Sequence, residues 1–229
     1  FGLFVLPESL RAPARDPFTL KRFNPFSSLL ALSRERLVLP ILLVITLYTL
    51  SQSLMQCTWA LYTEFRYGWS PKMIGISIFV LGAAITITQG WILPRLSAKL
   101  SPTHLVFAGL FCGFTALIGI GFSTAGTFLL PLLALFSLMG VVGPTLQSVI
   151  SRTGSPTTQG VRLGAASSLN SFTGAISPLL GTPLLFFTSQ SAPTDLAAGT
   201  PYFLAALLVL AAIILTILSP SQADAENTH

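Results

Sequence analysis

The sequence predicts an all-α protein that crosses a membrane six times. Of its residues 52% are hydrophobic and only 8% are charged, and the mean hydropathy is +0.77, whereas soluble domains carry about 25% charged residues. Apolar runs recur along nearly the whole chain, and several exceed the roughly 20 residues that a helix needs to cross a bilayer. The net charge of +5 comes mostly from basic residues beside these runs, so it indicates membrane orientation and no nucleic-acid partner.

The chain opens on two short segments that precede the first full span. Residues 1–6 are wholly apolar but too short to cross a bilayer, and we interpret them as the end of a preceding transmembrane helix. Residues 7–36 form a basic linker, in which Asn24 and Pro25 begin a short helix that we expect to lie in the membrane interface. Because the start has neither Met nor a basic region typical of a signal peptide, we interpret the chain as the later part of a longer protein.

Six spans follow within a membrane domain of residues 37–219. We expect them at residues 37–61, 73–93, 105–122, 128–150, 163–187 and 202–218, with residues 220–229 as a disordered polar tail. The second span carries glycines about one heptad apart, at Gly75, Gly82 and Gly90, which favours a close helix contact. The fifth is expected to be broken late, by Pro178, Gly181 and Pro183.

Basic residues predict the orientation. The 12 Lys and Arg residues concentrate in the linker and in two alternate loops, whereas the opposite side has only Arg66 and Lys72. The loop residues are Arg95, Lys99, Arg152 and Arg162. Since cytoplasmic loops carry the excess of basic residues, the linker, these loops and the tail are predicted in the cytoplasm, and the protein in a cell (inner or plasma) membrane in contact with lipid.

The first span has a polar face. Tyr48, Gln52 and Gln56 follow one another at successive turns. Trp59 and Tyr62 lie beyond them, where we expect an aromatic belt at the outer interface. The glutamines have two interpretations, because amides in lipid either bond neighbouring helices or line a wet cavity.

The fourth and fifth spans share a second polar stretch. Gly140, Gly143 and Pro144 loosen the fourth span shortly before Gln147, and the fifth carries Asn170 among several serines. Small and polar residues of this kind either join helices or form the wall of a substrate passage. We therefore regard Gly140, Gly143 and Pro144 as a candidate conformational hinge.

The sequence shows no pattern of catalytic or metal-binding residues. None of its acids falls near the middle of a predicted span, and His104 and His229 lie at a helix entrance and at the terminus. These positions argue against a catalytic Ser/His pair inside the membrane, and therefore against a rhomboid-like protease. No metal-ligand spacing or nucleotide-binding motif occurs, so we expect no enzyme, metal or cofactor. Cys57 and Cys112 lie inside spans and are interpreted as small buried hydrophobic residues.

Several stretches resemble the C-terminal half of tetracycline-resistance-type exporters of the major facilitator superfamily. They are residues 24–29, 59–77, 143–152 with Gln159 and Gly160, and 177–180. The resemblance implies a drug/proton antiporter of twelve spans, in which each half contains two inverted triplets of helices that rock around a midplane site. It also implies an N-terminal six-span half as partner. Residues 95–101 stand where a degenerate second copy of the family's cytoplasmic signature is expected, and the region of Cys112 lacks the acid that tetracycline exporters carry in their ninth span.

The resemblance turns the polar residues into a site hypothesis. It makes the spans of Gln52 and Gln147 equivalent, so these should face one another across a central passage. We expect Tyr48, Gln52, Gln56, Gln147 and Asn170 to contact a small amphipathic substrate through neutral hydrogen bonds, while protons are carried in the other half. Two alternatives remain open. One is a receptor or assembly partner that keeps only the fold, and the other is a half-size transporter that works as a homodimer.

Overall fold

The structure is a computed structural model that describes residues 38–152, 159–190 and 192–218. Six helical segments in this part are long and apolar enough to cross a membrane, which confirms the predicted fold class. They are Leu39–Tyr67, Pro71–Ser97, Pro102–Phe122, Gly126–Ser151, Arg162–Thr188 and Leu196–Leu218. No strand occurs in the described part. The predicted interfacial helix at Asn24, the rest of the linker, residues 1–6 and the tail lie outside it.

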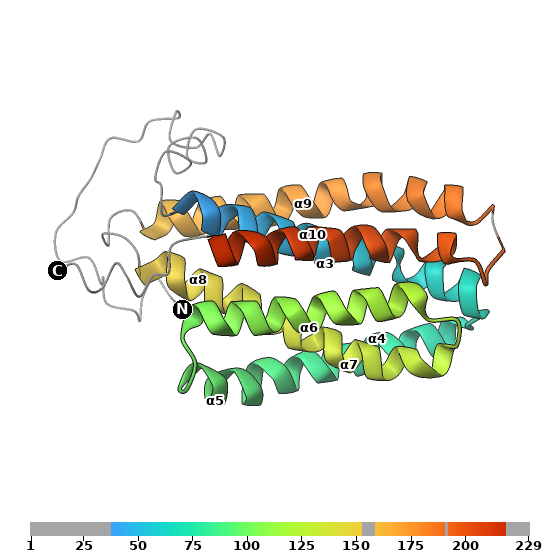
Figure 1. Cartoon of the computed structure of the whole chain (residues 1–229), viewed down its shortest axis with the longest axis horizontal. Helices are drawn as coiled ribbons and strands as arrows, with labels where there is room; N and C mark the ends of the chain where they lie inside the picture. Colours follow the sequence, from blue (N-terminus) through green and yellow to red (C-terminus); the bar gives the residue numbers. More distant parts are fainter. Residues whose placement is uncertain (1–37, 153–158, 191, 219–229) are drawn as a thin grey trace, which may run out of the picture.

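The helices run along the long axis of one bundle (Figure 1). In chain order they are α3 (Val38–Tyr67), α4 (Pro71–Ile87), η2 (Thr88–Ile92), α5 (Leu93–Ser97), α6 (Pro102–Phe122), η3 (Gly126–Phe128), α7 (Leu129–Ser137), η4 (Leu138–Val141), α8 (Val142–Arg152), α9 (Gln159–Thr188), η5 (Leu196–Gly199) and α10 (Thr200–Leu218). The start of α3, the turn between α5 and α6, and the end of α8 lie at the same end of the bundle. The segment with Arg95 and Lys99 and the end of α8 with Arg152 therefore share one end.

Two spans begin with the same local device. Ser70 and Ser101 are N-caps whose hydroxyls accept from the backbone N–H groups of Met73 and His104, and a proline follows each serine. The missing proline N–H costs nothing in a first helical turn, and its fixed φ suits the helix. Gly68, at φ +63, turns the chain from α3 into α4 in a conformation that glycine adopts readily.

The expected aromatic belt is wrong. Trp59 and Tyr62 are only 4% and 1% exposed, and both lie between helices. The Trp59 Nε1 donates to Ser77 Oγ at 2.9 Å, and the Tyr62 hydroxyl donates to the Ile120 carbonyl at 2.8 Å. Because neighbouring helices supply acceptors for both rings, the aromatic residues stabilise the core here instead of facing headgroups.

The first span extends past its predicted end because a charged residue is buried. Arg66 is 7% exposed. Its Nε donates to the Ser123 carbonyl at 2.8 Å and its Nη1 to the Asp195 carbonyl at 2.9 Å. These bonds join the end of α3 to the two other connections at this end of the bundle. The charge at Arg66 therefore does not end the helix, which continues to Tyr67.

The predicted break in the fifth span is also wrong. The helix α9 continues from Gln159 to Thr188 with Pro178 and Pro183 inside it. Pro178 has no N–H for the carbonyl of Gly174, four residues earlier, and the Ser177 hydroxyl donates to that carbonyl at 3.3 Å. Prolines are tolerated in transmembrane helices where such side chains satisfy the freed carbonyls.

The glycines of the second span do not make the expected contact. A Cβ atom built on Gly75, Gly82 or Gly90 would meet nothing within 4 Å, so this face of the helix is open in the described part of the chain. Close approach of backbones occurs elsewhere, where Gly199 of η5 lies against the backbone of Gly121 in α6. Glycine spacing alone could not distinguish these two situations.

Candidate functional site

A cavity of about 450 Å³ lies between α3, α8 and α9. Four of the five candidate substrate residues line it, namely Tyr48, Gln52, Gln147 and Asn170. The other lining residues are Ile45, Thr49, Gly143, Leu163, Ala166 and Ser167. The polar faces of three spans, which are far apart in the sequence, therefore meet in one place.

Hydrogen-bonded hydroxyls hold the walls of this cavity. Thr173 of α9 donates its hydroxyl to the Thr49 hydroxyl of α3 at 3.2 Å, and Thr49 donates to the Ile45 carbonyl at 2.7 Å. Gly143 packs beside the buried Tyr48 ring, since a Cβ atom at Gly143 would lie 3.5 Å from the Tyr48 hydroxyl oxygen, which is ordinary van der Waals contact. The wall is thus built from small residues and hydroxyls that serve packing.

The side-chain amides in the cavity, unlike these hydroxyls, do not hydrogen bond to the helices around them. The side chains of Gln52, Gln147 and Asn170 make no hydrogen bond or ion pair with any other residue that the structure describes. Each amide has two N–H donors and an acceptor oxygen. In an apolar setting these groups need a partner, and a polar ligand or water can provide one. The cavity is therefore suited to binding neutral polar groups next to an aromatic ring.

Gln56 does not join the other candidates. It is exposed and is not among the cavity residues. Residues four apart on an α-helix drift by about 40° per step, so a stripe that begins at Tyr48 has rotated away from α8 by the time it reaches Gln56. The prediction from i, i+4 spacing therefore extended the polar face of α3 one turn too far.

The fourth span is irregular at the candidate hinge. Between α7 and α8 the helix tightens into the 3-10 turn η4, which contains Gly140. Gly143 and Pro144 follow in the first turn of α8. The Gly140 carbonyl accepts a hydrogen bond from Gln89 Nε2 at 3.1 Å. Sequence reasoning missed this role of Gln89, although an amide inside the apolar run of the second span could have indicated it.

The cytoplasmic-loop candidates lie away from the cavity. Arg95 and Lys99 are exposed at the bundle end. Arg95 Nη1 donates to the Trp91 carbonyl at 2.9 Å, and its guanidinium lies 4.1 Å from the centre of the Trp91 ring. Arg152 is the last residue of α8.

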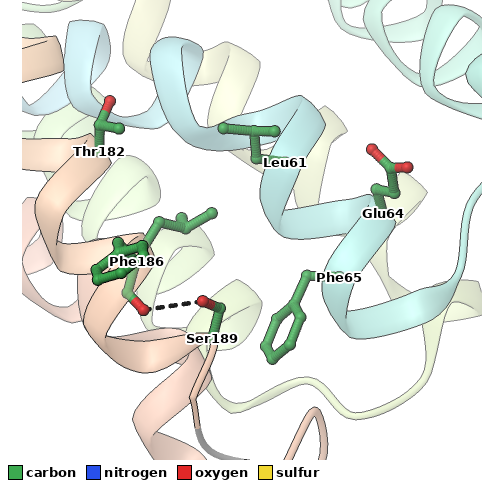
Figure 2. A pocket seen from close by; sticks show the side chains of 7 residues that line it. Leu61, Glu64, Phe65, Thr182, Phe186 and Ser189 are labelled. Carbon is green, nitrogen blue, oxygen red and sulfur yellow. Dashed lines mark hydrogen bonds between the residues drawn. The ribbon is translucent and has the colours of Figure 1, made fainter.

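A second hollow of about 430 Å³ lies toward the other end of α3 and α9. Figure 2 shows Leu61 and Phe65 on α3 beside Thr182 and Phe186 of α9 and Ser189, which directly follows that helix. The Ser189 hydroxyl donates to the Phe186 carbonyl at 2.8 Å and is thus already engaged. Apart from the exposed carboxylate of Glu64, the lining offers little polar chemistry, so the first cavity is the better candidate.

No group of three His, Cys, Asp or Glu side chains that could hold a metal ion occurs in the ranges that the structure describes. Cys57 and Cys112 are free thiols, half-buried within their helices. The chemistry of the candidate site is therefore that of amides, hydroxyls and a phenol.

Comparison with known proteins gives a family and several relatives. The family model of the Major Facilitator Superfamily matches residues 1–178. The class D tetracycline resistance protein of Salmonella ordonez is 31% identical over 82% of this chain and 48% of its own length. The class C protein of Escherichia coli is 27% identical over 80% and 46%, and the class B protein of Escherichia coli is 33% identical over 62% and 36%. The chain spans about half the length of the first two.

Proposed function

This chain belongs to the Major Facilitator Superfamily, and on that premise we propose that it is half of a secondary transporter that exports small amphipathic organic molecules. The cavity between α3, α8 and α9 is the observation that carries this proposal. The names of the relatives, tetracycline resistance proteins, support drug-like compounds as the substrate class.

The substrate contacts in this half are Tyr48, Gln52, Gln147 and Asn170. Their amides donate to and accept from hydroxyl, carbonyl and amide groups, and the Tyr48 ring packs against an apolar part of the substrate. A pocket that binds through neutral groups admits compounds of varied charge, because no fixed ion pair has to form. Broad selectivity follows from this chemistry.

Proton coupling and alternating access belong to the complete transporter. The acids in the described ranges are Glu64, near the end of α3, and Asp195, in the connection after α9, and neither lines the cavity. We place the proton-carrying group in an N-terminal six-span half, which rocks against this half around the central site. The end of the bundle with Arg95 and Lys99 faces the cytoplasm, since basic loops remain on that side.

Reconstitution tests the function. A complete transporter, consisting of this chain and an N-terminal half, is placed in lipid vesicles under an imposed proton gradient and offered a broad panel of amphipathic compounds. We expect accumulation that collapses with a protonophore, and none with the 229-residue chain alone. If a folded, inserted complete protein moves no compound on the panel, the transport proposal fails. That outcome favours the alternative role as a receptor or assembly partner.

A further inference from the structure

The fourth span contains a carbonyl group that its own helix cannot satisfy in the usual way. In an α-helix the Gly140 carbonyl would accept from the N–H of residue 144, but Pro144 has no N–H. Gly140 is buried, and the backbone around it forms the 3-10 turn η4. A freed carbonyl in an apolar setting is costly unless another group donates to it.

That donor comes from a different helix. The Gln89 Nε2 of η2 donates to the Gly140 carbonyl at 3.1 Å, and beside it the Thr88 and Ser137 hydroxyls lie 3.2 Å apart. The helix segment η2 is itself irregular, a π turn in which the Leu93 N–H reaches back to the Thr88 carbonyl. The Gln89 bond thus joins the irregular turns η2 and η4, and the Thr88–Ser137 pair joins η2 to the end of α7.

The other glycines placed four residues before a proline are accommodated differently in the described helices. Pro178 frees the Gly174 carbonyl, and Ser177 of the same helix donates to it. Pro94 follows Gly90 at the same spacing, and there the helix widens into the π turn. A hydrogen bond within one helix moves with that helix, whereas the bond from Gln89 fixes one span relative to another.

We propose that Gln89 is a positioning residue that sets the bend of the fourth span and thereby the place of Gln147 on the cavity wall. The inference rests on the proposed function only in that Gln147 contacts substrate. The bend is a two-state element. With the Gln89 bond made, η4 is held against η2. With the bond broken, the Gly140 carbonyl must find another donor, so the turn can change geometry while the transporter changes access.

Solid-state NMR in lipid bilayers tests the bond directly. The chain contains two Gly–Val pairs, Gly140–Val141 and Gly160–Val161. When glycine carbonyl carbons and valine nitrogens are labelled, only these two carbonyls are bonded to a labelled nitrogen. The Gly140 carbonyl signal can then be observed with the Gly160 signal as reference. Labelled glutamine side chains should show a dipolar coupling to the Gly140 carbonyl carbon in the unsubstituted protein, a measurement that needs no variant to fold. Absence of this coupling overturns the proposal.

Variants then test its consequence. Gln89→Met keeps the side-chain length but removes the donor, and should move the Gly140 carbonyl signal toward that of an unbonded carbonyl while the Gly160 signal stays in place. Pro144→Ala supplies the missing N–H, so Gln89→Met should have no effect in that background. An unchanged Gly140 signal in Gln89→Met, or an equal change in both backgrounds, contradicts the proposal.

Transport by the complete protein provides a second, separable measurement. We expect Gln89→Met to change the export rate about threefold, the scale of one interhelical hydrogen bond in a membrane, and to have no such effect with Pro144→Ala. Thr88→Val and Ser177→Ala are matched controls that leave the Gly140 bond intact. If the NMR results hold but no variant or parent transports, the function proposal fails while the Gln89 bond stands. If transport occurs and Gln89→Met behaves like the controls, the positioning role fails.

Discussion

Gln52 of α3 and Gln147 of α8 line the same cavity, and neither amide is hydrogen bonded to any residue that the structure describes. Replacing either by alanine should therefore change which compounds are exported more than it changes folding. The loss of one ligand hydrogen bond corresponds to about 1 kcal/mol, or roughly fivefold in apparent affinity. Export kinetics for a panel of compounds in vesicles measure the change.

Gln56→Ala is the matched control for this prediction, because Gln56 lies on the same helix outside the cavity. It should leave the order of preferred compounds unchanged. Equal effects of Gln56→Ala and Gln52→Ala would show that the α3 glutamines act through the helix and not through the cavity.

The fold followed from the sequence because the membrane constrains it strongly. Apolar length gave all six spans, and four of the five candidate substrate residues in α3, α8 and α9 meet in one cavity. What could not be predicted depends on contacts between helices. Trp59 is buried because Ser77 lies opposite it, and α9 stays continuous because Ser177 satisfies Gly174. Such partners depend on helix rotation, which periodicity alone does not determine.

A tight backbone contact predicts a large effect on stability. A Cβ atom on Gly199 would lie 2.9 Å from the carbonyl carbon and 3.0 Å from the Cα of Gly121, so Gly199→Ala has to displace η5 from α6. We expect a loss of about 1–3 kcal/mol in an SDS unfolding titration. The control Gly82→Ala adds its methyl group to open space and should stay within about 0.5 kcal/mol.

Arg66 should stabilise the connections at its end of the bundle. Arg66→Met removes the two donors to the Ser123 and Asp195 carbonyls, and hydrogen bonds to charged groups contribute about 1.5–3 kcal/mol each. Hydrogen exchange should accelerate in residues 123–126 and 195–199. Lys72→Met, at an exposed site at the same end, should not change it. Equal protection in both variants would contradict this role.

Glu64 should not carry the coupled proton. Its carboxylate is exposed near the end of α3 and lines the second hollow, not the cavity between α3, α8 and α9. Glu64→Gln in the complete transporter should therefore leave the dependence of export on the proton gradient unchanged. A variant that still binds compounds but no longer responds to the gradient would place coupling in this half of the protein.

The central claim is that the cavity between α3, α8 and α9 holds the exported compound, and accessibility with ligand protection tests it most directly. After Cys57 and Cys112 are replaced by alanine, single cysteines are introduced as Gln52→Cys, Asn170→Cys and, as control, Gln56→Cys in the complete transporter. A water-soluble maleimide should label all three, and an exported compound should slow labelling at residues 52 and 170 but not at residue 56. Equal labelling rates with and without the compound at all three positions would contradict the account.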